Sequence, residues 1–236
     1  MTATARHADG RHWILLVAGL LAGLCALSES RGGSRTRWRR RALECRGRSM
    51  NRPVWLLDVD GVLNATRPGW SAAPRNGTAY GAGHPYRLRW APALITHIRA
   101  LHNAESVTLR WCSTWCADAD QVERLFVLPR LERAWTEPIS HSAAPVAKLA
   151  AAHAVLDQGH RLIWTDDDAN PTSGPVYDEL VATGRALLIA PLASRGLQPE
   201  HLDTIKAFIS DTNVRDTGRV RADALETARR LLGDTE

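Results

Sequence analysis

The stretch PVWLLDVDGVLN, residues 53–64, places four consecutive apolar residues directly before two aspartates. The run Val54 to Leu57 is typical of a short strand that is buried on both faces of a sheet. Asp58 and Asp60 follow it, and Gly61 allows the chain to turn away steeply. Because open α/β sheets bind ligands at the carboxyl ends of their strands, this pattern predicts a strand that ends at a functional site.

The chain after Met50 continues to alternate apolar strands with helical patterns. We expect strands at 54–58, 107–112, 161–165 and 186–190. We expect helices after Pro92, at 117–127, 146–156 and 176–182, from Pro199 to 209, and, in a polar segment, at 219–232. This alternation predicts an α/β fold with a doubly wound parallel sheet and helices on both faces.

Composition divides the chain into a basic leader and a globular body. The 236 residues, 44% of them apolar, suffice for one sizeable α/β domain. Residues 1–49 hold ten arginines against three acidic residues, a net +7, whereas 50–236 hold 20 basic and 22 acidic residues, a net −2. We therefore expect a leader at 1–49, the folded domain at 50–210 and a helical tail at 211–236. The body gives no charge-based indication of a nucleic-acid partner.

The leader permits several interpretations because an apolar run, 13–27, lies between basic residues. A basic start, an apolar core and the small residues Ala26 and Ser28 are typical of a signal peptide. The run is shorter than the roughly 17 residues that a membrane-spanning helix needs. Alternatively, 1–49 is a disordered tail, or translation begins at Met50, directly before the first strand. We expect a cytoplasmic protein, or an exported or membrane-anchored one if residues 1–30 are a true signal or anchor.

Polar side chains stand at the ends of three predicted strands, and a lysine stands near the start of a helix between the second and third. They are Asp58 and Asp60, Ser113 and Thr114, Asp166, Asp167 and Asp168, and Lys148. Carboxylates that converge on one edge of a sheet repel each other, and burying them uncompensated is costly. A divalent cation removes this cost, and oxygen ligands with retained waters suit Mg²⁺. The sequence therefore predicts a magnesium site.

This set of residues also fits phosphoryl transfer. Asp58 can attack phosphorus and form an aspartyl-phosphate. Asp60, after the strand-to-loop turn, can protonate the leaving oxygen and then activate water. Ser113 and Lys148 can hold the phosphoryl oxygens, and the lysine also offsets negative charge.

The segment DVDGVLN resembles motif I of the haloacid dehalogenase (HAD) superfamily, an apolar strand followed by DxDG. The hydroxyl after the second strand, the lysine and the segment WTDDD resemble motifs II, III and IV in the same order. The resemblance covers about 54–210. More narrowly, WLLDVDGVLN, RWCSTWCADAD, LIWTDDDAN and GLQPEHLDTI resemble the HAD domains associated with bacterial Swiss Army Knife RNA repair proteins.

The resemblance implies a magnesium-dependent phosphoric monoester hydrolase with a HAD-like Rossmannoid fold. It implies that Asp58 is the nucleophile and a metal ligand, and that Asp60 is the acid/base and binds the metal through its backbone. Ser113, with Thr114 as the adjacent alternative, and Lys148 correspond to the phosphate-binding hydroxyl and the motif III base. Asp166 and Asp167 correspond to the motif IV metal ligands. Asp168 is a third acid where two are usual, so the set of the three that reaches the metal stays open.

Simpler interpretations exist for each feature taken alone. Aspartates after strands favour turns and helix caps, and a Ser-Thr pair before a helix is a common N-cap. Cys112 and Cys116 lack the second pair that a zinc site needs. The GAGH segment, 81–84, lacks the third glycine of a dinucleotide-binding loop. Beyond the motifs, four side chains are candidates to line the site: Trp70, Trp115, His84 and His141.

The spacing of the motifs leaves no room for a large cap domain. The Gly/Pro-rich segment 65–90 can form a flap that carries Tyr80, Tyr86 and Arg87 to Arg89. An uncapped site suits a small phosphate ester as well as a phosphorylated macromolecular end, including a nucleic-acid terminus. The alternative is a non-catalytic HAD-like binding module, although a complete acidic set with its lysine favours catalysis.

Overall fold

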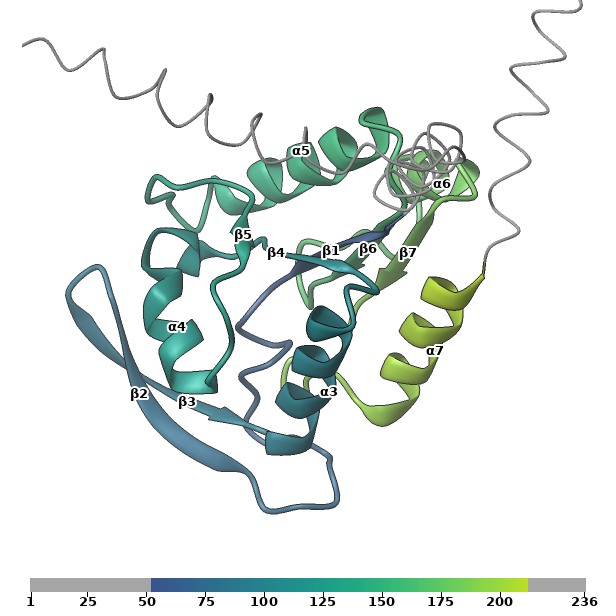
Figure 1. The fold of residues 1–236 in the computed structure, drawn as a ribbon. Helices are drawn as coiled ribbons and strands as arrows, with labels where there is room; N and C mark the ends of the chain where they lie inside the picture. The colour runs from purple at the N-terminus through teal and green to yellow at the C-terminus, as the bar shows by residue number, and fades with distance from the viewer. Residues whose placement is uncertain (1–51, 212–236) are drawn as a thin grey trace, which may run out of the picture. The chain divides into compact units, whose positions relative to one another are not determined.

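The computed structural model describes residues 52–211, which form an α/β domain around a five-stranded sheet (Figure 1). The strands are β1 (Val54–Leu57), β4 (Thr108–Trp111), β5 (Glu132–Arg133), β6 (Leu162–Thr165) and β7 (Ala186–Ile189). They lie in the order β5-β4-β1-β6-β7, and every neighbouring pair is parallel. The chain builds outward from β1 to one edge and then to the other, so the order reverses at β1. Such a reversal point is where α/β sheets bind ligands.

Helices cover both faces of the sheet. They are α3 (Pro92–Asn103), α4 (Ala119–Phe126), α5 (Ala144–Asp157), α6 (Pro175–Ala182) and α7 (Pro199–Ser210), with a 3₁₀ helix, η1 (Thr114–Asp118), before α4. Figure 1 shows α3 and α7 on one side of the sheet and α5 and α6 on the other. The predicted parallel sheet with helices on both faces is confirmed.

Side-chain alternation along β1 divides the core between these two layers. Trp55 and Leu57 pack in the cluster that includes α3, α4 and α7, whereas Val54 and Leu56 pack in the cluster that includes α5 and α6. All four are at most 3% exposed. Because successive side chains of a strand point to opposite faces, a strand covered on both sides needs an unbroken apolar run. This run fixes β1 at the centre of the sheet, with its carboxyl end at the reversal point.

The segment between β1 and β4 contains an antiparallel hairpin, β2 (Arg75–Gly81) and β3 (His84–Trp90), followed by α3. No further domain lies in this segment. Ala82 and Gly83 make the two-residue turn with positive φ at both positions, as a type I′ turn requires. The GAGH segment is therefore a hairpin turn. Leu88 and Trp90 are buried in the core, so the hairpin packs against the domain by one face.

The predicted boundaries mostly lie within a few residues of the observed ones. The structure contains one strand that the sequence did not predict, β5, which has no apolar run. The segment after β4 begins with the 3₁₀ helix η1. Cys112 and Cys116 are buried and carry free thiols. In the described part of the chain, no helix has both the length and the apolar character that crossing a bilayer requires. The predictions for the leader and for a helix at 219–232 lie outside the described residues.

Candidate functional site

The carboxyl edge of the sheet gathers the predicted residues from separate elements. Strand register aligns Leu57 with Thr165 of β6, so Asp58 and Asp166 leave adjacent strands side by side. On the other side of β1, Leu57 is aligned with Trp111, which brings the loop after β4 to the same edge. Helix α5 carries Lys148 one turn after its start, and the lysine reaches Asp58 and Asp166 at this edge.

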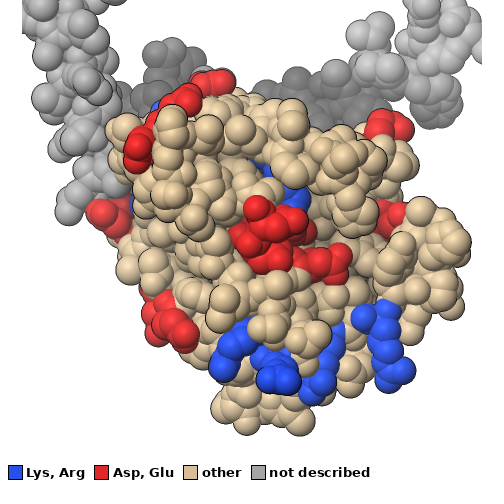
Figure 2. All heavy atoms as spheres, turned by 180° about the vertical axis from the view of Figure 1, so that it is seen from behind, with Lys and Arg blue, Asp and Glu red and all other residues tan. Residues whose placement is uncertain are grey.

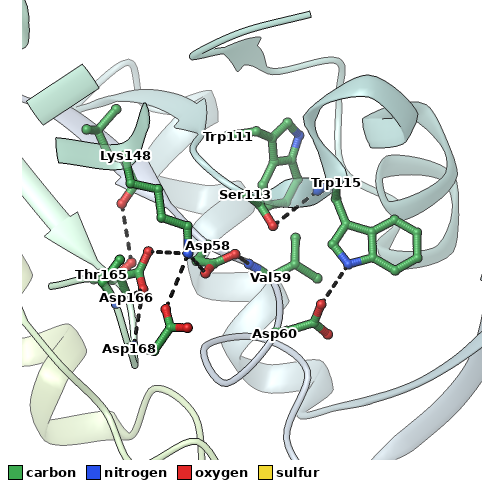
Figure 3. A network of polar contacts seen from close by, with 12 residues as sticks. Asp58, Val59, Asp60, Trp111, Ser113, Trp115, Lys148, Thr165, Asp166 and Asp168 are labelled. Atoms are coloured by element: carbon green, nitrogen blue, oxygen red, sulfur yellow. Dashed lines mark hydrogen bonds and ion pairs between the residues drawn. The ribbon is translucent and has the colours of Figure 1, made fainter. Parts of the chain in front are cut away.

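Lys148 is the centre of a buried charge network (Figure 3). Its Nζ lies 2.5 Å from Asp58 Oδ2, 2.7 Å from Asp166 Oδ2 and 3.6 Å from Asp168 Oδ1. Lys148 is 4% exposed, Asp58 is 5% exposed and Asp166 is fully buried. Lysine and aspartate are seldom buried unless they are paired, so the ion pairs of Lys148 with these carboxylates explain why all three side chains can be buried here.

Four carboxylates form a compact group around this lysine: Asp58, Asp166, Asp167 and Asp168, each with an oxygen within 4.8 Å of the others. Two backbone N–H groups, those of Asp168 and Ala169, donate to Asp166 Oδ1 at 3.3 and 2.9 Å. These bonds fold the loop after β6 back on itself and keep all three acids at the edge. The structure therefore includes Asp168 in the acidic group, and which of the three acids bind the metal stays a prediction.

Gly61 makes this packing possible. It has φ +67°, and a Cβ added to it would lie 2.1 Å from Asp167 Cγ. No side chain fits at that distance, and a positive φ is strained for residues other than glycine. The predicted role of Gly61 as a steep turn beside the acidic group is consistent with both observations.

The electrostatics of the group favour an added cation. Burial and the negative charge of Asp166 raise the pKa of Asp58 to about 7, although Lys148 acts in the opposite direction. Burial also raises the pKa of Asp166 and of Asp167, whereas a hydrogen bond with Asp166 lowers the pKa of the more exposed Asp168. Burial lowers the pKa of the Lys148 ammonium, but the charges of Asp58 and Asp166 outweigh burial and raise it above its ordinary value. One ammonium therefore leaves the carboxylates only partly compensated.

The carboxylate of Asp60 lies apart from this group. Its Oδ2 accepts a hydrogen bond from Trp115 Nε1 at 2.9 Å, and its Oδ1 accepts one from Asn64 Nδ2 at 2.6 Å. Asp60 is exposed, in contrast to Asp58 two residues before it. Its binding to a metal through the backbone stays a prediction, since only its side chain has defined partners here. The two donors hold the Asp60 carboxylate at the side of the site, away from Lys148.

The acidic group opens into a cavity of about 130 Å³. Its walls are formed by Asp58, Asp60, Thr114, His141, Ala144, Pro145, Lys148, Asp167 and Asp168. Ser113 does not line it: the residue is 1% exposed, its hydroxyl accepts a weak hydrogen bond from Trp115 N at 3.4 Å, and it acts to lower the pKa of Asp58. The geometry thus assigns different surroundings to the two predicted hydroxyls, with Ser113 against the Asp58 carboxylate and Thr114 facing the cavity.

Of the four further candidates, two belong to the site and two do not. His141 lines the cavity, and Trp115 donates a hydrogen bond to Asp60, which also lines it. His84 lies at the hairpin turn, and Trp70 donates its indole N–H to Leu197 O at 2.8 Å. Neither lines the cavity.

Asn64 is a site residue that the sequence interpretation gave no role. Its Nδ2 holds Asp60, and its Oδ1 accepts the backbone N–H of Arg89 at 2.8 Å. The sequence signal that could have identified it is its position four residues after Asp60. Residues 59–64 form a tight turn closed by hydrogen bonds to Val59 O, which brings the Asn64 side chain back toward Asp60. An asparagine at the end of such a turn can reach back to the residue that begins it.

Comparisons of the chain with protein-family models, with curated proteins and with solved structures found no match. The case for a function therefore depends on the chemistry of this sheet edge.

Proposed function

We propose that this protein is a HAD-type, magnesium-dependent phosphatase that hydrolyses phosphoric monoesters through an aspartyl-phosphate. The observation that carries the proposal is the meeting of Asp58, Lys148 and the loop Asp166 to Asp168 at the carboxyl end of the central strand. The strand order reverses at this strand, as in a Rossmann-like fold. The four motifs that resemble the HAD superfamily all contribute to this one edge.

The donor set fits Mg²⁺. Four carboxylates with oxygens within 4.8 Å of one another offer only hard oxygen ligands, which Mg²⁺ prefers. The pKa values of three of them, Asp58, Asp166 and Asp167, are raised, so the single lysine does not fully compensate the group. Asp58, Asp166, Asp167 and Asp168 would hold the ion, and the resemblance adds the backbone of Asp60. When bound, Mg²⁺ supplies positive charge that stabilises the phosphoryl oxygens.

Asp58 would act as the nucleophile. Each of its oxygens already accepts a hydrogen bond, Oδ1 from Val59 N at 2.6 Å and Oδ2 from Lys148. A carboxylate oxygen has a second lone pair, so these bonds fix the side chain without consuming its nucleophilic capacity. In the first step an Asp58 oxygen forms a bond to phosphorus while the bond from phosphorus to the alcohol oxygen breaks.

Asp60 would act as the general acid of the first step and the general base of the second. It lines the same cavity as Asp58 but is exposed and lies outside the acidic group. In the protonated form it gives its proton to the departing alcohol oxygen. It then takes a proton from water, and the resulting hydroxide attacks phosphorus and frees Asp58 and inorganic phosphate. The hydrogen bonds from Trp115 and Asn64 orient the carboxyl for both transfers.

Lys148 and the hydroxyl groups would complete the phosphate site. Lys148 favours the ionised form of Asp58 and would offset the negative charge of the transferred group. Thr114 faces the cavity and can donate to a phosphoryl oxygen, and Ser113 acts to lower the pKa of the nucleophile. His141 enters the same cavity from the loop before α5 and is a further donor.

The experiment is a magnesium-dependent hydrolysis screen of the full chain with small phosphate esters and with 3′- and 5′-phosphorylated oligonucleotides. Asp58→Asn should abolish turnover with every leaving group. Asp60→Asn should cost on the order of 10²–10⁴-fold with alkyl leaving groups and much less with p-nitrophenolate, which needs little protonation. Beryllium fluoride, a mimic of the aspartyl-phosphate, should protect the wild type but not Asp58→Asn against thermal unfolding. Full activity of Asp58→Asn would refute the assignment, and binding without any turnover would favour a non-catalytic module.

A further inference from the structure

A second cavity, of about 480 Å³, lies beside the acidic site and has a different chemical character. It is lined by Gly61, Asn64, Ala65, Thr66, Asn76, Arg87, Arg89 and Ala193. Its volume falls in the range of small-molecule sites. Two guanidinium groups with amide and hydroxyl donors, and no carboxylate in the lining, make it suited to an anion. On the face shown in Figure 2, acidic side chains fill a central hollow and basic side chains gather beside it.

The hairpin places both arginines on one face. Leu88 and Trp90 of β3 are buried against the core, so Arg87 and Arg89, which alternate with them, point to the opposite side. Across the hairpin Arg89 is aligned with Asn76, which lines the same cavity. Arg87 and Arg89 are exposed, and neither takes part in an ion pair among residues 52–211. Two exposed cations without counter-charges on one strand are available to a ligand.

The two cavities are held in a fixed relation by the turn after β1. The Asn64 side chain donates to the Asp60 carboxylate on the acidic side and accepts a hydrogen bond from the backbone N–H of Arg89 on the basic side. The next residue, Ala65, donates its N–H to Arg89 O at 2.9 Å. Gly61 lines the basic cavity while it packs against the Asp167 carboxylate of the acidic group. The turn 60–65 therefore contributes residues to both cavities, which places them next to each other.

We propose that the Arg87/Arg89 cavity binds a second phosphate of the substrate, adjoining the phosphate that is hydrolysed. The proposal depends on the phosphatase function above. It makes the preferred substrates phosphomonoesters that carry another phosphate nearby, either a second monoester or a phosphodiester link to a further residue. The arginines interact with a group that does not react, so they contribute binding energy equally to the ground state and the transition state. Loss of the arginines then raises KM and leaves kcat unchanged.

The test compares three substrates of the full chain with Mg²⁺: a nucleoside 5′-monophosphate, a nucleoside 3′,5′-bisphosphate and a 5′-phosphorylated dinucleotide. Hydrogen bonds between charged groups are worth roughly a tenfold change in affinity each, or more when desolvated. We therefore expect Arg87→Gln/Arg89→Gln to raise KM for the bisphosphate, the dinucleotide or both by about ten- to hundredfold. The monophosphate should be hydrolysed as by the wild type. A KM increase for the bisphosphate identifies a monoester as the natural second group, and a KM increase for the dinucleotide identifies a diester.

The matched control removes two positive charges elsewhere on the surface, with Arg124→Gln/Arg130→Gln. It should leave all three KM values unchanged, which separates a local site from a general effect of net charge. Because Arg87 and Arg89 are exposed, the double variant should fold; the single variant Arg87→Gln gives the same test with a smaller effect. Direct binding of the bisphosphate to Asp58→Asn, with and without the arginine substitutions, is measured by calorimetry.

These readouts separate the two proposals. Hydrolysis without preference for a second phosphate, or equal KM changes for all three substrates, would overturn the second-phosphate site and leave the phosphatase standing. If no substrate is hydrolysed but the bisphosphate binds in an arginine-dependent manner, the cavity is a phosphate-binding site, but the phosphatase function, and with it the role of the arginines toward a phosphatase substrate, is refuted. Arginine-independent binding would overturn the site directly.

Discussion

Lys148→Met tests the charge balance of the acidic group without requiring that a substrate be known. The substitution keeps an unbranched side chain of similar length and removes the ammonium that lies 2.5 Å from Asp58 Oδ2 and 2.7 Å from Asp166 Oδ2. Removing one partner of a buried ion pair costs about 3–5 kcal/mol, because it leaves an uncompensated buried charge. With a urea m-value of about 2 kcal/mol per M, the unfolding midpoint should fall by about 2 M.

The size of the loss should depend on pH. Without the ammonium, the folded-state pKa values of Asp58 and Asp166 rise further above their ordinary value of 3.8. A carboxyl with a raised folded pKa favours the folded state when protonated, so its contribution is lost as pH rises from the unfolded pKa through the folded one. The penalty of Lys148→Met should therefore be larger at pH about 8 than at pH about 5. Added Mg²⁺ should restore much of the loss, because it binds only the folded cluster.

The assay is urea unfolding followed by tryptophan fluorescence at both pH values, with EDTA or with excess Mg²⁺. Lys206→Met is the matched control, since Lys206 is partly exposed and pairs with Asp203 only at 3.4 Å. It should cost less than about 1 kcal/mol at either pH. A loss for Lys148→Met no larger than that of the control, or a loss that does not change between the two pH values, would refute the account of a buried ammonium holding ionised carboxylates.

Two further predictions concern the same edge. Gly61→Ala should destabilise the domain and weaken Mg²⁺ binding, because its Cβ would collide with the Asp167 carboxylate at 2.1 Å; Gly83→Ala is the control, with φ +81° but nothing within 4 Å, and equal Mg²⁺ affinities would contradict the argument. In EDTA, the wild-type unfolding free energy should fall as pH rises from about 4 to about 7, since three clustered carboxyls have raised pKa values and only one has a lowered value. Urea midpoints that rise over this range would show that compensation by the lysine is complete.

The sequence predicted the centre of the fold well because its signals there are strong. The short apolar runs at 54–57 and 162–164 are typical of strands covered on both faces, and β1 and β6 are buried along their whole length. In a parallel sheet, the residues that follow such strands must share an edge. The convergence of Asp58 and Asp166 therefore follows from strand direction alone. Lys148 can reach this edge because it lies one turn after the start of α5.

Features that depend on tertiary packing left weaker signals. β2 contains Asn76 and Gly77, which disfavour strands, and the hairpin is stabilised instead by burial of Leu88 and Trp90. β5 has two residues and is set by its pairing with β4. The hydrogen bond from Trp115 to Asp60 joins residues 55 positions apart, and no local pattern announces such a contact.

In the proposed phosphatase, the charge of the cluster would also constrain the order in which metal and phosphate bind. Asp58, Asp166, Asp167 and Asp168 face a single ammonium, so the fully ionised group is strongly negative. A phosphate dianion that approached this group alone would be repelled at the cavity that Asp58 lines. In the absence of a metal, protons provide part of the missing positive charge, which is the physical content of the raised pKa of Asp58. A divalent cation can replace those protons and leave Asp58 ionised and nucleophilic. In the proposed phosphatase, the cost of holding these four carboxylates together would therefore make cation binding the step that precedes phosphate binding, and Lys148 would stabilise the cluster before that step.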